Sequence, residues 1–206
     1  SIPPGIVAAW RASRHAAVTA GAAMAVEGLA RKVSAADVPE DLRGVAVGCA
    51  ECHLLRPMAH ADTFEHNGYD VHTVVSPDDC RTCHSQEADQ YSRNIMAHAY
   101  GNLADNALYG QLEQAILGRP RVAGAAVRFE APDADTRAEA CYYCHGTALK
   151  VEGTEVRDTD AGELSFPIIS GWPNQGVGRI NLDGSKGACS ACHTRHAFSI
   201  QMARKP

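Results

Sequence analysis

The sequence is poor in aromatic residues, which make up 6% of its 206 residues, although hydrophobic residues make up 45%. Aromatic side chains dominate the cores of most globular domains, so another group must fill part of this interior. The longest run of small apolar residues, 20–30, is short and contains Glu27, so no membrane-spanning segment is predicted. The formal net charge of −5 disfavours a nucleic-acid partner.

All eight cysteines belong to four copies of the pattern Cys-x-x-Cys-His. We call these copies motif 1 (49–53), motif 2 (80–84), motif 3 (141–145) and motif 4 (189–193). Their cysteines and histidines are Cys49, Cys52, His53, Cys80, Cys83, His84, Cys141, Cys144, His145, Cys189, Cys192 and His193. In this pattern the two thiols form thioethers with a haem, and the histidine becomes the proximal ligand of its iron. The sequence therefore predicts four covalently attached haem c groups.

Zinc sites and disulfides are the two alternatives for paired cysteines. Two Cys-x-x-Cys pairs can bind a tetrahedral zinc ion, and an even number of cysteines in an exported chain can form a disulfide framework. Neither structure needs a histidine in the fifth place. Histidine is 10 of 206 residues, so its presence there in every copy has odds on the order of one in 10^5 by chance. The pattern favours haem.

Six further histidines are available, which is enough to give every iron a second imidazole. These distal candidates are His15, His60, His66, His72, His98 and His196. An iron with two imidazole ligands is low-spin and closed to substrate, so such haems transfer electrons. A methionine ligand would raise the reduction potential of one haem. The four methionines, at positions 24, 58, 96 and 202, are interpreted as packing residues because histidines are in surplus.

A distal ligand must approach the far face of the porphyrin, so it is expected from a segment other than the haem's own motif. His98 is the strongest candidate, because the stretch 87–100 after motif 2 is typical of a helix. His15 comes next, since a helix predicted over 5–18 provides a rigid element that can direct its imidazole inward.

The remaining histidines form a cluster and one separate residue. The cluster of His60, His66 and His72 is expected to provide one or two ligands, and its other members are expected near the ligands or on the surface. His196 lies three residues after His193. This spacing is too short for it to bind the opposite face of its own haem, so we expect it to reach a neighbouring haem.

The spacing of apolar residues predicts a mainly α fold with extensive loops. Helices are expected over residues 5–18, 87–100, 103–117 and 136–144. Two stretches rich in glycine and proline, 118–135 and 146–187, are expected to be loops. Short helices and coil would then wrap around a chain of four haems, with little β-structure. No polar linker separates the early pair of motifs from the two later ones, so a single tetrahaem domain is expected over residues 1–206.

The chemistry of the motifs also predicts location and partners. Haem is attached covalently outside the cytoplasmic membrane, so an exported protein, extracellular or periplasmic, is expected, with a signal peptide removed before Ser1. Its partners are expected to be other redox proteins. Four arginines are expected to pair with haem propionates: Arg119, Arg121, Arg179 and Arg195.

Several segments resemble a known family of multihaem c-type cytochromes, the octahaem hydroxylamine oxidoreductases. The resembling segments are 66–84, 94–102, 171–185, 189–199 and 203–206. The segment around motif 4 is similar to the region around that family's fourth haem, and the earlier segments are similar to its early haem region. The resemblance implies that this chain corresponds to the family's N-terminal, tetrahaem half. It also implies that His193 is the proximal ligand of the haem that is catalytic and open in the family.

The chain departs from that family after motif 4. It stops at Pro206, before the fifth haem motif and before the aspartate, histidine and tyrosine that the family uses on its substrate. No catalytic residue is therefore carried over, and an electron carrier is expected in preference to an enzyme.

Two functions are compatible with these patterns. The first is electron transfer through bis-histidine haems, in a protein that is either soluble or the subunit of an extracellular conductive filament. In that filament a neighbouring copy donates a ligand to the His193 haem through a head-to-tail contact, similar to polymeric tetrahaem cytochrome nanowires. The alternative is a haem oxidoreductase, or a fragment or subunit of one, that acts on small nitrogen or sulfur compounds at an open His193 haem.

Overall fold

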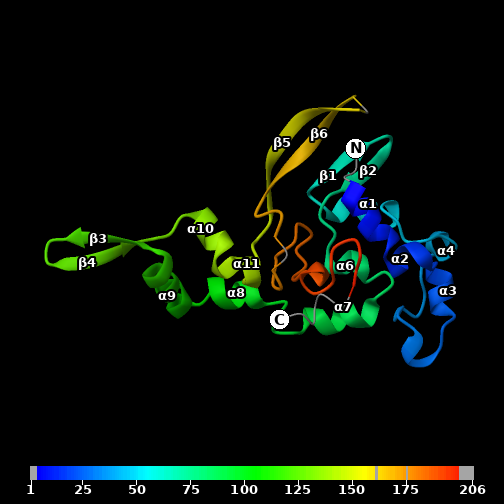
Figure 1. The fold of residues 1–206 in the computed structure, drawn as a ribbon, viewed down its shortest axis with the longest axis horizontal. Coiled ribbons are helices and arrows are strands. Elements are labelled where there is room, and N and C mark those ends of the chain that lie inside the picture. Colours follow the sequence, from blue (N-terminus) through cyan, green and yellow to red (C-terminus); the bar gives the residue numbers. More distant parts are fainter. Residues whose placement is uncertain (1–3, 161, 175, 200–206) are drawn as a thin grey trace.

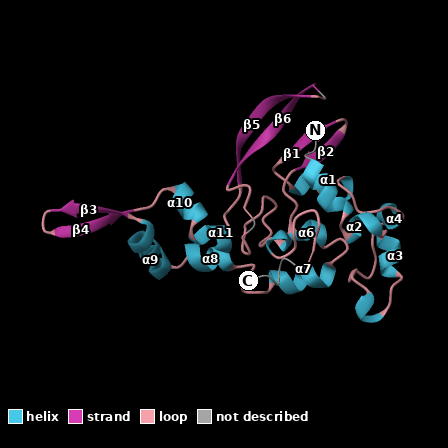
Figure 2. Ribbon diagram, viewed as in Figure 1, coloured by secondary structure: helices cyan, strands magenta, loops and turns pink. Residues whose placement is uncertain are grey.

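The fold consists of short helices and small sheets, and the computed structural model describes residues 4–160, 162–174 and 176–199. The early helices are α1 (Pro4–Arg11), α2 (Arg14–Ala17), α3 (Ala20–Met24), α4 (Glu40–Arg43) and α5 (Ala50–His53), with the 3-10 turns η1 (Gly28–Ala30) and η2 (Pro57–Ala59). The later ones are α6 (Pro77–Cys80), α7 (Ser85–Ser92), α8 (Ala99–Ala104), α9 (Ala107–Leu117), α10 (Ala134–Glu139) and α11 (Cys141–His145), with the turn η3 (Cys189–Ala191). Figure 2 shows the long connections between them.

Each sheet in the described part of the chain is a single antiparallel hairpin. The hairpins are β1 (Thr63–His66) with β2 (Tyr69–His72), β3 (Arg119–Ala123) with β4 (Ala126–Glu130), and β5 (Lys150–Thr159) with β6 (Gly162–Ser170). In Figure 1, α9, β3 and β4 extend away from the other elements. We call these residues, 107–130, the arm, and the other described residues the body.

The helix predicted over residues 5–18 is present but broken in two. Between α1 and α2, Ser13 takes an extended conformation, and its side chain accepts a hydrogen bond from the backbone N–H of Ala16. A serine in this place is an N-cap, which starts a new helix in a new direction. The second of the two helices carries His15, so the cap helps to set the direction of that imidazole.

The other three predicted helices are also interrupted. A turn separates α7 from α8 inside the stretch 87–100. The side chain of Asn106 accepts a hydrogen bond from the N–H of Leu108 at the start of α9. Ala140, which has a non-helical backbone conformation, separates α10 from α11 inside the stretch 136–144. Short polar side chains that bond nearby backbone groups compete with helix continuation, so apolar spacing alone does not place such breaks.

The two stretches predicted to be loops contain hairpins, so this part of the prediction is wrong. β3 and β4 are joined at Gly124, whose φ of 65° suits a tight hairpin turn. β6 contains Pro167, which a two-stranded sheet tolerates because each of its strands has a free edge. Glycine and proline therefore mark turns and edges here, and the fold has more β-structure than predicted.

Few large side chains are buried in the body. Among the described residues eleven hydrophobic residues are buried, and six of these are alanines. A cluster of Ala20, Val33, Ala35 and Val38 forms a small core, against which Cys83 of motif 2 packs. A core of this size agrees with the expectation that groups other than side chains occupy much of the interior.

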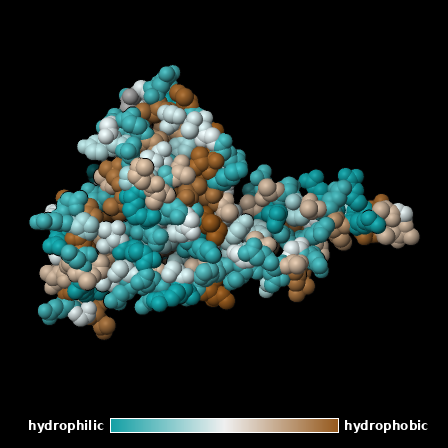
Figure 3. Space-filling model, turned by 180° about the vertical axis from the view of Figure 1, so that it is seen from behind, coloured by the Kyte–Doolittle hydropathy of each residue, from teal (hydrophilic) through white to brown (hydrophobic). Residues whose placement is uncertain are grey.

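The exposed surface is larger than the mass of the chain requires. The polypeptide exposes 12996 Å², whereas a compact monomer of 21.9 kDa exposes about 9,300 Å². Figure 3 shows hydrophobic side chains at the surface of both the body and the arm. This surplus agrees with the expectation that groups other than side chains cover part of the interior surface. None of the helices in the described residues has the length and apolarity needed to cross a lipid bilayer.

Candidate functional site

Each of the four motifs contains a short helical segment: α5 in motif 1, α6 leading into motif 2, α11 in motif 3 and η3 in motif 4. In motif 2 the backbone N–H of His84 donates to the carbonyl oxygen of Cys80 at 2.8 Å. Motifs 1 and 4 repeat this bond at 2.9 Å. Residues four apart lie on one face of a helix, so the first cysteine and the histidine of a motif face the same side. This is the arrangement that one porphyrin needs.

The eight cysteines are free thiols, and all of them lie in described parts of the chain. Their placement opposes both alternatives to haem. No disulfide joins them, and they form no four-sulfur cluster: the group of side chains that could hold a metal ion in the described residues is His60, His72 and Asp79, which includes no cysteine. The thiols are therefore available for thioether bonds.

Three of the predicted proximal histidines are held by backbone carbonyls. The Nδ1 atom of His53 lies 2.7 Å from the carbonyl oxygen of His72, and that of His145 lies 3.3 Å from the carbonyl oxygen of Ala99. His84 makes a comparable bond to the backbone of Lys32. An imidazole whose Nδ1–H donates to a carbonyl presents a bare Nε2 to a metal, so the bonds of His53 and His145 fix the tautomer that iron requires. The donor set thus fits haem.

His15 lies near two of the predicted proximal histidines, His84 and His193. Its ring centroid lies 6.2 Å from that of His84, with an angle of 63° between the rings. Two imidazoles on opposite faces of one iron have centroids about 6 Å apart, because each metal–nitrogen bond is about 2 Å long. Burial and the neighbouring charges of His84 and His193 lower the pKa of His15, which favours the neutral form that binds metal.

His60 and His72 stack on each other with centroids 3.7 Å apart. The Nε2 atom of His72 is buried and has no hydrogen-bond partner, while its Nδ1 atom lies 3.2 Å from the carbonyl oxygen of Val74. His60 is different, because its nitrogens face Asp79 at 3.1 Å and Asp62 at 3.7 Å. Burial lowers the pKa of His60, but these carboxylates outweigh it and raise the pKa to about 9. The Nδ1 atom of His60 also has no hydrogen-bond partner, but it faces Asp62, so His72 is the member of the pair whose unpartnered nitrogen is in no ion pair.

The other predicted distal ligands lie in three different places. His196 is near motif 1: burial and the charges of His53 and Arg195 lower its pKa. His66 lies on β1, where its Nε2 atom is 3.5 Å from the side-chain nitrogen of Asn67. His98 precedes α8, and its Nε2 atom lies 2.9 Å from the carbonyl oxygen of Ser92.

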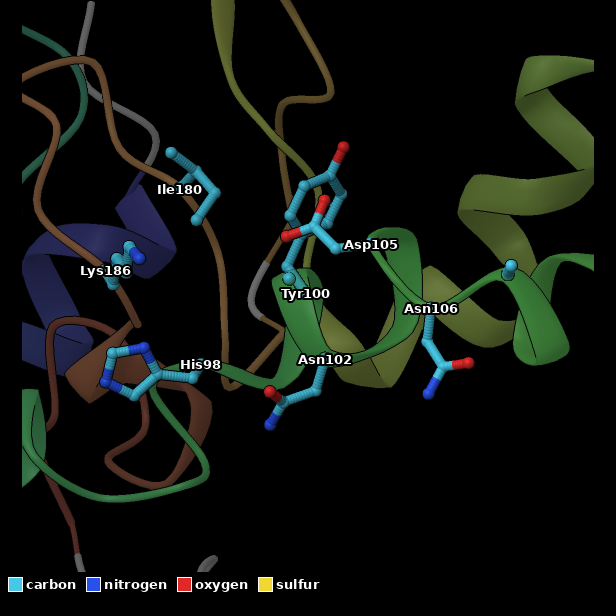
Figure 4. Close-up of a pocket in the computed structure, with 9 residues that line it drawn as sticks. His98, Tyr100, Asn102, Asp105, Asn106, Ile180 and Lys186 are labelled. Atoms are coloured by element: carbon cyan, nitrogen blue, oxygen red, sulfur yellow. The ribbon is translucent and has the colours of Figure 1, made fainter.

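A cavity of about 630 Å³ opens beside His98. Its lining residues include His98, Tyr100, Asn102, Asp105, Asn106, Ile180 and Lys186. Figure 4 shows His98 near Lys186 and Ile180, with the other labelled side chains coming from α8 and the loop after it. A cavity of this volume accepts a ligand of cofactor size. The carbonyl of Ala99, which holds His145 of motif 3, is next to His98 in the sequence.

Motifs 2 and 4 meet at their first cysteines. The thiols of Cys80 and Cys189 are hydrogen-bonded to each other, and this contact together with burial raises the pKa of Cys80 well above its ordinary value. Cys52 of motif 1 lies close enough to Cys80 and Cys83 for their charges to interact. Three of the four motifs therefore converge in one part of the body.

The segment 171–187 connects motif 3 with the other motifs. The N–H of Gly178 donates to the carbonyl oxygen of His145 at 3.1 Å. A Cβ atom on Gly178 would lie 2.5 Å from the backbone nitrogen of Tyr100 and 2.8 Å from the carbonyl oxygen of His145. A side chain does not fit there, so glycine allows this close approach. This segment contains 171–185, one of the stretches that resemble the octahaem family. Gln175 within it lies outside the described residues, and so does another resembling stretch, 203–206.

The four arginines predicted to pair with propionates divide into two pairs. Arg119 and Arg121 lie at the arm, where they form ion pairs of 3.4 Å with Asp133 and 2.8 Å with Glu130. Arg179 is buried in the body, and Arg195 follows motif 4. The first pair already has carboxylate partners and lies on β3, which is far from α6 of motif 2 in Figure 1.

The methionines and a set of buried carboxylates complete the description of the site. Met24 packs beside the small core as interpreted from the sequence, whereas Met58 and Met96 are exposed, so the interpretation as packing residues is wrong for these two; Met202 lies outside the described residues. A network of buried carboxylates, Asp62, Asp79 and Asp183, is not predicted by any pattern described above. The sequence Ser-Pro-Asp-Asp before motif 2 is the available signal, because Ser76 and Asp79 form a capping box there.

Comparisons with known proteins agree with this site. The family model for cytochrome c554 and c-prime matches residues 79–165, which include motifs 2 and 3. A solved structure described as a hypothetical multiheme protein matches with a TM-score of 0.90 and 41% identity. The match covers 100% of this chain and 39% of that chain, so this chain spans well under half of the matched protein's length. No curated protein matches the chain.

The match to the solved structure supports the predicted multihaem fold, with the correction that the two predicted loops are hairpins. The resemblance to the octahaem hydroxylamine oxidoreductase family stays a prediction. Free paired thiols, carbonyl-held imidazoles, the match to the cytochrome c554 family model and the likeness to a multihaem structure together support a multihaem c-type cytochrome.

Proposed function

We propose that the protein transfers electrons through four covalently bound haems, one on each motif. The observation that carries the proposal is the contact between the thiols of Cys80 and Cys189, with Cys52 close by. Haems attached at these cysteines have neighbouring edges, which suits the passage of an electron from one haem to the next. Because haem c is attached outside the cytoplasm, we also propose an exported protein whose partners are other redox proteins.

Each haem, when bound, supplies an iron that gains or loses one electron. The chain holds it by thioethers and by a proximal histidine. For the haem on motif 2 we propose His15 as distal ligand, because its 6.2 Å separation from His84 suits two imidazoles on one iron. The cavity beside His98 and the carbonyl that holds His145 support a haem on motif 3 in that region.

In the stacked pair we propose His72 as the ligand and His60 as the residue that positions it. The buried Nε2 atom of His72 has no partner, whereas both nitrogens of His60 face carboxylates. We place His72 on an iron other than that of His53. The centroids of the two rings are 5.9 Å apart, but the carbonyl of His72 lies 2.7 Å from the Nδ1 atom of His53, beside the nitrogen that does not bind iron, so we expect both residues on the same side of that porphyrin.

Mass spectrometry and optical spectra test the electron-transfer proposal. The intact mass should equal the chain plus four haems, and the ferric and ferrous spectra should be low-spin. Addition of carbon monoxide or hydroxylamine should leave the spectra unchanged. A preparation that binds zinc, or that carries fewer than four haems after full maturation, would contradict the proposal.

A haem oxidoreductase for small nitrogen or sulfur compounds is the second candidate, and the position of His15 favours it. His15 lies near both His84 and His193, but one imidazole nitrogen serves one iron. If His15 binds the haem of motif 2, the haem on His193 needs a distal ligand from elsewhere or has an open position. A high-spin band, carbon monoxide binding at one haem and turnover of hydroxylamine would establish this function.

The arm supports assembly into a filament, the finer form of the carrier proposal. Leu108, Ile116 and Val122 have exposed fractions of 72%, 67% and 82%. A second copy that covers these side chains can form a head-to-tail contact, and such contacts propagate when their rotation does not close a ring. In this arrangement a histidine of the neighbouring copy completes the His193 haem. Electron microscopy of the native preparation distinguishes filaments from monomers.

A further inference from the structure

Two arginines of the body lie against the same tryptophan. The guanidinium carbon of Arg195 is 4.6 Å from the centroid of the Trp172 ring, and that of Arg179 is 5.3 Å away. Both distances are typical of cation–π contacts. The two positive charges are close enough to repel each other: burial and the charge of Arg195 lower the pKa of Arg179 to about 10.

Neither arginine has a carboxylate partner among the described residues. Arg179 donates three hydrogen bonds to neutral acceptors, the side-chain oxygen of Asn181 at 2.7 Å and the carbonyl oxygens of Asn174 at 3.0 Å and Val75 at 3.1 Å. The Nη2 atom of Arg195 is buried and has no hydrogen-bond partner in the described part of the chain. These bonds hold the Arg179 side chain in place without neutralising its charge.

Two further observations point to an anion at this place. The hydroxyl oxygen of Thr194, next to Arg195 in the sequence, is also buried without a hydrogen-bond partner. The nearby carboxylate of Asp183 is already used, because it accepts hydrogen bonds from Ser76, Arg56 and Ser185. Buried cations with unused donors are costly unless a counter-charge is present.

We propose that Arg179, Arg195 and Thr194 form a binding site for a carboxylate, and that its occupant is a propionate of a bound haem. This inference rests on the proposed function, since the haem is the source of the carboxylate. Arg195 is two residues after His193, and Arg179 interacts electrostatically with Cys189. A propionate can therefore reach the arginines, and guanidinium groups bind carboxylates through paired hydrogen bonds.

The site should raise the reduction potential of the haem whose propionate it binds. Ferric haem carries one more positive charge than ferrous haem, so fixed cations beside the propionate favour the ferrous form. A free oxyanion such as nitrite or sulfite has similar chemistry and is the other source of negative oxygen. The two sources differ in one respect, because a propionate is present at fixed stoichiometry and a free anion is not.

The test is a redox titration of the haem-loaded protein and of Arg195→Gln, with Arg195→Lys as the variant that keeps the charge. We expect Arg195→Gln to shift the ferric-to-ferrous equilibrium of one haem about tenfold toward ferric, ~59 mV lower for a one-electron couple. Arg195→Lys should restore most of the shift. The exposed arm variant Arg128→Gln is the control and should leave every potential unchanged.

A second measurement separates the two sources of the anion. The wild-type protein is titrated with nitrite, sulfite and phosphate at constant ionic strength while the potentials are followed. If none of the three anions changes the potentials, the propionate is supported as the occupant. A saturable change that is absent in Arg195→Gln would show that the occupant is a free anion, and it would overturn the assignment of the propionate. If no potential moves in Arg195→Gln, the site has no anion and the inference is wrong.

The haem content of each sample distinguishes this failure from failure of the proposed function. Intact mass is measured on the same preparations. Four haems with unchanged potentials in Arg195→Gln would remove the anion site alone. Absence of haem from the wild-type protein would remove the proposed function, and the anion site with it.

Discussion

The ring centroid of His15 lies 6.2 Å from that of His84, although the two residues are far apart in the sequence. The N-cap at Ser13 places His15 on its own short helix, and a bond to the backbone of Lys32 holds His84. The His84 ring is thus held by a backbone contact, whereas the His15 ring packs edge-on against Phe198 with centroids 4.7 Å apart. Such positioning matters because a metal ligand must hold its direction before the metal binds.

The first prediction concerns His15 as an axial ligand. In His15→Ala one haem of the four should lose its sixth ligand, become high-spin and bind carbon monoxide, while the other three stay low-spin. In His15→Met the same haem should stay low-spin with a higher reduction potential. Absorption and electron paramagnetic resonance spectra measure both effects. Arg14→Ala, at an exposed position on the same helix, is the control; unaltered spectra in His15→Ala would show that His15 binds no iron.

The second prediction concerns the close approach at Gly178. A Cβ there would lie 2.5 Å from the nitrogen of Tyr100, so Gly178→Ala must displace the segment that holds motif 3. We expect a loss of about 1–3 kcal/mol in the free energy of unfolding, typical of overpacking, and reduced haem occupancy on motif 3. Denaturant unfolding and peptide mass spectrometry measure these effects.

Gly110 provides the matched control for that substitution. A Cβ on Gly110 would meet nothing within 4 Å, and the residue lies inside α9. Gly110→Ala should therefore stabilise the arm helix by up to about 1 kcal/mol. Equal effects of the two alanine variants would mean that the contact at Gly178 does not position motif 3.

The third prediction concerns the dependence of stability on pH. Burial raises the pKa of Asp183, but hydrogen bonds from Ser185, Ser76 and Arg56 outweigh it, so the pKa lies below its ordinary value of 3.8. A carboxylate with a lowered pKa stabilises the fold above the unfolded pKa, and this stabilisation is lost as pH falls through the folded pKa. Asp183→Asn should cost about 1–3 kcal/mol near neutral pH, because buried donors lose a charged acceptor.

The difference between wild type and Asp183→Asn should shrink in acid. Urea unfolding from about pH 7 to about pH 3 measures this convergence. Asp70→Asn, at an exposed position on β2, is the control and should follow the wild-type curve. A constant difference over the whole range would mean that Asp183 is not ionised in the folded protein.

The fourth prediction concerns the arm as a contact between copies. The double variant Val122→Ser, Phe129→Ser replaces side chains with exposed fractions of 82% and 41%. Exposed substitutions of this kind change stability by less than about 0.5 kcal/mol, so haem content and unfolding should stay as in the wild type. Filaments seen by electron microscopy should disappear.

A matched substitution lies on a different hairpin. Val156 has an exposed fraction of 67% and belongs to β5, so Val156→Ser tests whether any loss of surface hydrophobicity has the same effect. We expect filaments of this variant to persist. If the arm variant still forms filaments, or if both variants lose them, the arm is not the specific contact between copies.

The secondary structure was partly predictable. Apolar spacing predicts helices where α1, α7, α9 and α10 lie, because that spacing follows directly from the helical repeat. It misses the breaks at Ser13 and Asn106, where a side chain bonds its own backbone. It also misses the arm hairpin, whose short strands and Gly124 turn have the composition of a loop.

The sequence alone determined the haem chemistry. Two thiols and an imidazole within five residues can contact one porphyrin whatever the rest of the chain does, so their spacing is sufficient for the prediction. Tertiary structure decided which motifs meet, as at Cys80 and Cys189, and which spare histidine lies between carboxylates, as His60 does and His72 does not. Those relationships join segments far apart in the chain, and they depend on the direction of side chains in space, which no local pattern of residues contains.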